Sequence, residues 1–196
     1  MSPKVVSSRR PLTARPLDLV YFIFFVSHIF ASLCVDFQPL YPRALLPSFL
    51  RHFVEWYLRI SNDPLLKSAF GRGGEPLIWF KSFLFLEVFF QFPTFFLAAR
   101  GLFNDSKKIY VLVLVYAAST ATTVWPCVTT ILATPGPSPE ALTRGIATVS
   151  PEQRVMLLSS YVPFFVVPLI MTVDMAFRVY AIVNESLDAR VADKQK

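Results

Sequence analysis

The sequence predicts an all-α, polytopic membrane protein: a bundle of four transmembrane helices with kinks and an internal pocket. Of its 196 residues, 54% are hydrophobic and only 16% are charged, whereas a soluble domain carries about 25% charge. Four apolar stretches are each long enough to cross a bilayer, and polar side chains and prolines lie within them. This composition excludes a disordered chain and a disulfide-rich secreted module, and it argues against a soluble enzyme.

The four stretches define the organisation of the chain. A helix needs about 20 apolar residues to cross a hydrocarbon core of about 30 Å. None of the stretches shows the alternation of a membrane β-strand, and backbone groups in lipid must pair internally. We expect a transmembrane domain over 17–183, tails over 1–16 and 184–196, and disorder at Met1–Arg10 and Ala189–Lys196. The predicted helices are 17–35, 77–99, 109–132 and 156–183.

The net charge is +6, and the basic residues flank the apolar runs. At these positions Lys and Arg set the membrane topology and contact lipid headgroups. We therefore expect no nucleic-acid partner. Four crossings place both termini on one side of the membrane. That side carries 11 Lys and Arg residues against 7 on the other. The positive-inside rule therefore predicts cytosolic termini.

The two cysteines, Cys34 and Cys127, both fall inside apolar runs. Buried free thiols are the expectation, because the sequence has no metal-ligand spacing and no disulfide framework. We therefore expect neither a metal nor a cofactor.

The long first loop, Phe37–Pro76, contains an amphipathic helical pattern that fits a helix lying against the membrane or capping the bundle. Asn62-Asp63-Pro64 should end it, because Pro disfavours helix at the preceding residue. The apolar face of the pattern is Phe49, Phe53, Trp56 and Ile60, and the charged face is Arg51, Glu55 and Arg59.

Ionisable groups at membrane depth are costly, so each of them is a functional hypothesis. Asp36 ends the first helix, and Glu87 lies halfway along the Phe-rich second helix with Gln91 one turn later. A charge at Glu87 needs a partner, or the group stays protonated, which favours a functional pocket there. His28 is either a hydrogen-bonded interior histidine or a pocket residue, and the Ser and Thr residues of the third helix fit helix contacts or a pocket.

Prolines interrupt three of the four predicted helices. Pro removes a helical hydrogen bond and kinks the axis, and kinked helices open a cavity between them more easily than straight ones. The prolines are Pro93, Pro126, Pro163 and Pro168.

Six strings, in order, resemble the sigma-2 receptor family, whose members are EXPERA-domain membrane proteins related to the emopamil-binding proteins. They cover about 17–171, most of the chain. The strings are YFIFFVSHI, VDFQPLYP, WYLRISNDPLL, WFKSFLFLEVFFQFPTFF, ATTVWP and SSYVPFFVVPL.

This resemblance implies a receptor in the endoplasmic reticulum membrane, with nuclear and endolysosomal membranes as further locations. It implies a homodimer and an intramembrane pocket for sterols and amphiphilic cationic amines. It also implies a role in cholesterol homeostasis and trafficking, including contact with a transporter of the Niemann-Pick type C kind.

Residue by residue, Asp36 matches the family's amine-binding aspartate, Glu87 matches a protonated carboxyl beside it, and Asp63 matches a structural aspartate. Phe164 stands where the family often has a tyrosine. His28 is a further ligand-binding candidate. Pro93 and Pro126 join Asp63 as structural candidates. The remaining pocket positions are Tyr57, Gln91, Thr123 and Tyr161.

Two functions fit these residues. One is a non-catalytic receptor for sterols and amines, and the other is a sterol double-bond isomerase of the emopamil-binding type. An isomerase stabilises a carbocation, which a cationic amine mimics, so both would use carboxyls in a dry pocket. An isomerase also needs a second acid–base group across the double bond. The third helix offers Ser and Thr but no carboxylate or His, which favours the receptor. A third hypothesis is that the chain is a chaperone of another membrane protein.

Overall fold

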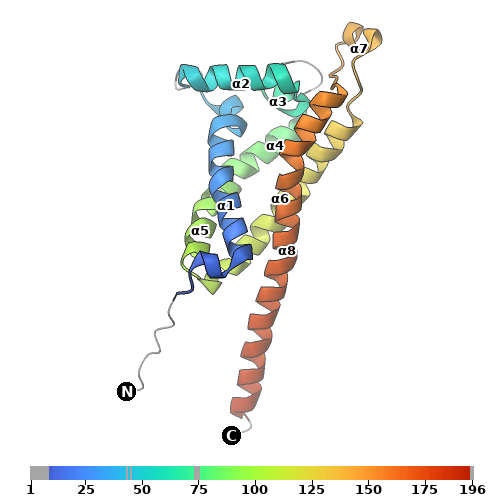
Figure 1. Cartoon of the computed structure of the whole chain (residues 1–196). Coiled ribbons are helices and arrows are strands. Elements are labelled where there is room, and N and C mark those ends of the chain that lie inside the picture. The colour runs from blue at the N-terminus through green and yellow to red at the C-terminus, as the bar shows by residue number, and fades with distance from the viewer. Residues whose placement is uncertain (1–8, 43, 45, 73–75, 195–196) are drawn as a thin grey trace.

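The computed structural model describes residues 9–42, 44, 46–72 and 76–194, and within them it confirms the all-α fold with four helical spans long and apolar enough to cross a membrane (Figure 1). The first span joins α1 (Pro16–Ala31) to a π-helical turn at Ser32–Asp36. The second joins α4 (Ile78–Leu86), a π-helical turn at Glu87–Gln91 and α5 (Phe92–Phe103). The third contains α6 (Tyr110–Ala133), and the fourth is α8 (Pro151–Lys194).

Aromatic packing holds the four spans together. Helix α6 lies along α8, and α1 lies along α5. Tyr21 and Phe25 of α1, Phe95 of α5 and Tyr116 of α6 are fully buried in one cluster, which Met171 of α8 completes. Burying such a side chain contributes roughly 1.5–3 kcal/mol. The cluster draws residues from all four spans, and Phe164 of α8, which also lines the cavity described below, packs against it.

Short helices close the end of the bundle opposite the termini (Figure 1). Helix α2 (Ser48–Ser61) lies across this end, followed by α3 (Pro64–Ala69) and, between the last two spans, α7 (Pro139–Thr143). Helix α2 ends where Asn62-Asp63-Pro64 predicted it to end, and Asn62 takes the left-handed conformation there, at φ 53°. Val54 and Leu58 of α2 are buried, so α2 caps the bundle. The predicted apolar face is not the buried one, since Phe49, Phe53, Trp56 and Ile60 are all exposed.

An ion-pair network closes the end that carries the termini. Asp18 of α1 pairs with Arg15 and, at 2.6 Å, with Arg178 of α8. Arg178 also pairs with Asp174 one turn earlier, at 2.8 Å. Arg15 further contacts Asp105 at 3.4 Å, in the connection between the second and third spans. Charged side chains at this end of the bundle are thus paired with one another.

One expectation about the tails is wrong. Helix α8 continues without a break to Lys194, so Ala189–Lys194 is helical, where the sequence analysis expected disorder. The residues after Val183 are mostly Ala, Leu, Glu, Asp, Arg and Lys with no Gly or Pro, and most of these favour helix. Residues 1–8 and 195–196, also expected to be disordered, lie outside the described residues. The helix also runs through Pro163 and Pro168.

Candidate functional site

A cavity of about 270 Å³ lies between the four spans, with α2 and α3 above it. Small-molecule sites span roughly 300–1,000 Å³, so this cavity lies just below that range. Every span contributes to its wall. Aromatic and aliphatic side chains predominate, among them Phe53, Phe80, Phe83, Leu84 and Val124.

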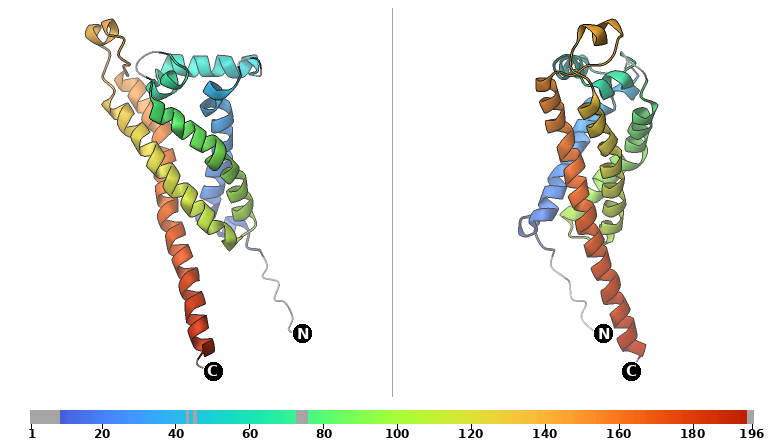
Figure 2. Two further views of the ribbon diagram at one scale, coloured as in Figure 1. Left: turned by 180° about the vertical axis from the view of Figure 1, so that it is seen from behind. Right: turned by 90° about the vertical axis from the view of Figure 1, so that its right-hand side faces the viewer.

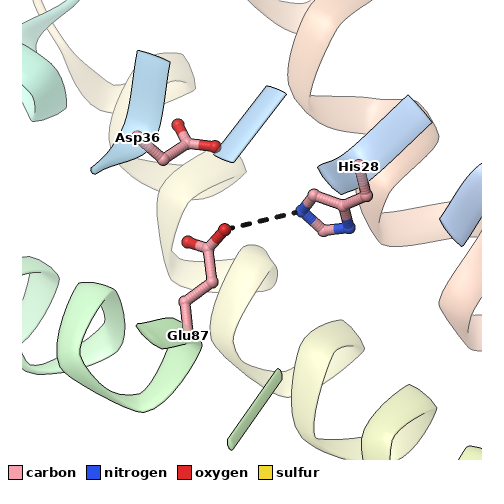
Figure 3. Close-up of side chains that lie close together, drawn as sticks. All are labelled: His28, Asp36 and Glu87. Carbon is pink, nitrogen blue, oxygen red and sulfur yellow. Dashed lines mark ion pairs between the residues drawn. The ribbon is translucent and has the colours of Figure 1, made fainter. Parts of the chain in front are cut away.

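Two carboxyls face this cavity, and each lies in a π-helical turn. Asp36 is the last residue of the turn Ser32–Asp36, and Glu87 is the first residue of the turn Glu87–Gln91. A π-helical turn changes the direction of the side chains that follow it, and such turns are frequent at functional sites. The two turns bring Asp36 and Glu87 toward each other across the first and second spans, as Figure 3 shows.

Glu87 is nearly buried and makes specific contacts. The Ser32 hydroxyl donates a hydrogen bond of 2.5 Å to Glu87 Oε1, and His28 Nε2 lies 3.8 Å from the same oxygen. His28, Asp36 and Glu87 each offer one atom that could bind a cation, and these three atoms lie within 4.8 Å of one another (Figure 3). Such a group has the geometry to hold a cation, whether an ammonium or a metal ion.

His28 combines both of the roles considered from the sequence. Its Nδ1 shares a hydrogen bond of 3.3 Å with the Tyr116 hydroxyl. Its ring stacks on Phe95 at 4.5 Å and contacts Phe164 at 4.6 Å between centroids. The other nitrogen faces Glu87. The histidine is therefore a hydrogen-bonded interior residue and also part of the cavity wall.

All the ligand-binding candidates named from the sequence line this one cavity, although they come from all four spans and from α2. Their contact with a ligand remains a prediction. The candidates are His28, Asp36, Tyr57, Glu87, Gln91, Thr123, Tyr161 and Phe164.

Asp63, expected to be structural, is fully buried at the start of α3. Its Oδ1 accepts hydrogen bonds from the backbone N–H groups of Leu65 and Leu66, as a helix N-cap does. Its Oδ2 accepts from the hydroxyls of Tyr57, at 3.2 Å, and Tyr161, at 2.9 Å. Burial raises the pKa of Asp63, and these donors oppose that rise. Asp63 thereby fixes two pocket tyrosines to the cap of the bundle.

The other structural candidates are two prolines within the helical spans. Pro93 lies in the first turn of α5, directly after the π-helical turn. Pro126 lies inside α6, which continues through it.

Ser32 is the contact that sequence reasoning missed. His28, Ser32 and Asp36 are spaced four residues apart, which places them on one face of a helix. That spacing was the available signal. The bond to Glu87, 55 positions later, could not be anticipated, because it depends on how the two π-helical turns meet. Thr120, Cys127 and Ser160 are further wall residues that the prediction left out.

The fold and the site together define a class: a four-span membrane protein with an intramembrane cavity of apolar wall and paired carboxyls. Residues 49–175 match the EXPERA family, the expanded EBP superfamily. The chain is 34% identical to sigma intracellular receptor 2 of Macaca fascicularis and 33% identical to that of Homo sapiens, in each case over 84% of this chain and 90% of the relative. It is also 28% identical to efficient mitochondria targeting-associated protein 19 of Schizosaccharomyces pombe, over 89% of this chain and 88% of the relative.

The chain therefore belongs to the EXPERA family and, within it, to the family of the sigma intracellular receptor 2 proteins.

Proposed function

We propose that this chain is a non-catalytic membrane receptor that binds sterols and amphiphilic cationic amines in its intramembrane cavity and acts in sterol homeostasis and trafficking. The observation that carries the proposal is the pair of carboxyls, Asp36 and Glu87, facing one largely apolar cavity. The relatives named sigma intracellular receptor 2 support the receptor class.

The site suits an amphiphilic cation in two ways. The Asp36 carboxyl would hold the ammonium by a charge-assisted hydrogen bond, and the aromatic wall would bury the apolar body of the ligand. Phe53, Phe83 and Phe164 present ring surface to such a body. A sterol would use the same apolar wall and offer its hydroxyl to the polar groups.

Competition on the wild-type protein tests this proposal. In lipid nanodiscs, an amphiphilic amine such as a tertiary phenylalkylamine should bind saturably, and cholesterol should displace it with a raised apparent Kd and an unchanged number of sites. A shared cavity requires this behaviour. If cholesterol left amine binding unaffected at every concentration, the two ligands would not share the cavity, and the proposal would fail.

The alternative function is sterol double-bond isomerisation, and the proximity of His28 Nε2 to Glu87 favours it. Opposite these groups, the residues of α6 that line the cavity are Thr120, Thr123, Val124 and Cys127. None of these four is a carboxylate or an imidazole, which leaves no second acid–base group on that wall.

We therefore expect the purified protein to leave a Δ8 sterol unchanged and to fail to restore growth in a yeast strain that lacks its sterol isomerase. Gas chromatography of the sterols is the measurement, with a known isomerase as the positive control. Conversion that disappears in Glu87→Gln would establish the enzyme and refute the receptor.

We further propose that the chain resides in the endoplasmic reticulum membrane with both termini in the cytosol. The termini lie at the same end of the bundle (Figure 1), and the Lys and Arg distribution favours the cytosol for that end. An engineered glycosylation sequon in the loop before α2 should be modified, whereas one after Lys194 should stay unmodified. A sequon glycosylated only at the C-terminus would reverse the orientation.

A further inference from the structure

Three side chains of the cavity wall point toward one another: His28 and Asp36 of the first span and Glu87 of the second (Figure 3). These two spans lie side by side in the bundle (Figure 2). Each side chain offers one atom to a metal ion, and the three atoms lie within 4.8 Å of one another. Bonds of about 2.0–2.2 Å in a tetrahedral site place neighbouring ligand atoms roughly 3.4 Å apart. His28 Nε2 and Glu87 Oε1 are 3.8 Å apart, so small side-chain rotations would close the group around one ion.

The charges of the cavity favour a divalent ion over a monovalent one. Asp36 and Glu87 both face the cavity, and among the described residues that line it there is no Lys or Arg. An ammonium balances one carboxylate and leaves the other protonated or unpaired, whereas a divalent ion balances both. Because an unpaired charge is costly in apolar surroundings, a doubly charged ion is the more complete match for two carboxylates.

The atoms that would bind the ion are those without a hydrogen bond. His28 is only 7% exposed, and its Nδ1 is engaged by the Tyr116 hydroxyl. Its Nε2 faces Glu87 at 3.8 Å, which is too far for a hydrogen bond. Within the part of the chain that the structure describes, neither this nitrogen nor the Asp36 carboxyl makes a hydrogen bond. Buried polar groups normally have a partner, and an ion bound here would supply one to both.

The hydrogen bonds that these side chains do make are those expected around a metal ion. A metal-binding histidine usually donates its second ring nitrogen to an acceptor, and ligating carboxylates accept further hydrogen bonds. With the proton on Nδ1, His28 donates to the Tyr116 oxygen at 3.3 Å and directs the lone pair of Nε2 at Glu87. The Ser32 hydroxyl donates to Glu87 Oε1 at 2.5 Å. Tyr116 and Ser32 are fully buried, so water does not compete for these contacts.

The donor atoms select the class of metal. One imidazole and two carboxylates suit Zn²⁺ and the neighbouring divalent transition ions such as Co²⁺. Mg²⁺ and Ca²⁺ instead take about six to eight ligands, all of them oxygen. The ligands come from two spans and show none of the local spacings of metal motifs. For this reason we expected no metal from the sequence.

We propose that His28, Asp36 and Glu87 form a binding site for a divalent transition-metal ion, with the Ser32 and Tyr116 hydroxyls as its outer contacts. The site uses the two carboxyls that face the ligand cavity, so a bound ion and a cationic amine exclude each other. Metal binding itself is independent of the proposed receptor function, and only the competition with the amine rests on it.

Titration with Co²⁺ tests the site. The protein is purified through a tag that contains no histidine and is reconstituted in lipid nanodiscs. Co²⁺ should give the visible absorption of a bound ion at one ion per chain, and Zn²⁺ should abolish it. His28→Gln should raise the Co²⁺ dissociation constant at least about tenfold, since even the loss of an outer contact costs about 10- to 100-fold. His52→Gln is the matched control, because it removes the other histidine, which is exposed on α2, and it should bind Co²⁺ like wild type.

Tyr116→Phe tests the outer contact while keeping the aromatic ring in the core. It should weaken Co²⁺ binding about 10- to 100-fold, with a circular dichroism spectrum like that of wild type. If wild type bound no Co²⁺, or if wild type, His28→Gln and Tyr116→Phe bound it equally well, the proposal would be overturned.

Competition with the amine separates the metal site from the proposed ligand. Zn²⁺ should raise the apparent dissociation constant of the amine in wild type and much less in His28→Gln. Amine binding without any Co²⁺ binding would refute the metal site and leave the receptor function standing. Co²⁺ binding by a protein that binds no amine would support the metal site and refute the proposed ligand.

Discussion

Replacing Asp36 with Asn is expected to lower the affinity for a cationic amine about 10- to 150-fold. The substitution keeps the shape of the side chain and removes its charge. A hydrogen bond to a charged group contributes about 1.5–3 kcal/mol, which corresponds to this range of dissociation constants. Asp36 is an end residue of its π-helical turn, so the change should not disturb the fold. Calorimetric titration of the amine against both proteins in nanodiscs gives the two constants.

Glu87→Gln serves as the matched control for this prediction. An amide still accepts the Ser32 hydrogen bond seen at 2.5 Å and can donate a hydrogen bond toward Asp36, so the loss of amine affinity should be smaller than in Asp36→Asn. The resemblance to the family implies a protonated Glu87 beside Asp36, and we expected such a carboxyl to donate a hydrogen bond to Asp36. Among the described residues, Ser32 is the partner that the structure gives to Glu87 instead. If Glu87→Gln lowered the amine affinity more than Asp36→Asn does, Glu87 and not Asp36 would hold the ammonium, and our assignment would be wrong.

Replacing Asp63 with Ala should have the largest effect on stability. It removes the cap of α3, which costs about 0.5–2 kcal/mol. It also leaves the buried hydroxyls of Tyr57 and Tyr161 without their acceptor, and an unsatisfied buried group costs about 1–3 kcal/mol. A combined loss of about 3 kcal/mol or more should lower the Tm by at least about 6 °C, as measured by thermal unfolding in detergent. A Tm within about one degree of wild type would refute the structural role.

The pH dependence distinguishes the charge of Asp63 from its shape. Burial raises the pKa of Asp63 in the folded protein. The stability linked to its proton is therefore fully present below the unfolded pKa of about 3.9 and is lost as the pH rises through the folded pKa. Asp63→Asn lacks this group, so the stability advantage of wild type over Asp63→Asn should narrow with rising pH. An advantage that widens with rising pH would contradict the raised pKa.

The sequence predicts the spans well because lipid leaves the backbone few choices. Apolar runs of sufficient length must be helices. Three of the four predicted ranges lie within the observed spans, and the range 77–99 begins one residue before its span, which starts at Ile78. The end of α8 was missed because the prediction equated the end of hydrophobicity with the end of the helix. Past Val183 the helix continues on intrinsic propensity, without an apolar run.

The sequence predicted the candidate site less completely than it predicted the spans. Polar residues at membrane depth indicated the cavity, and the resemblance to a known family selected which of them face it. The two π-helical turns that aim Asp36 and Glu87 at each other leave no sequence signal, because an extra residue in a helical turn changes no periodicity that a short segment can reveal. Asp63 accepts four hydrogen bonds. The one from Tyr161 likewise could not be predicted, because it requires α8 to lie beside the start of α3.

The ratio of sterol affinity to amine affinity in Asp36→Asn tests the central claim most directly, since it separates the charge at the site from the cavity. Titration of cholesterol and of the amine against wild type and Asp36→Asn, in identical nanodiscs, gives the four dissociation constants. The predicted result is a loss of amine affinity of about 10- to 150-fold with sterol affinity nearly unchanged. An equal loss of both affinities would mean that Asp36 supports the fold and does not hold the ligand's cation.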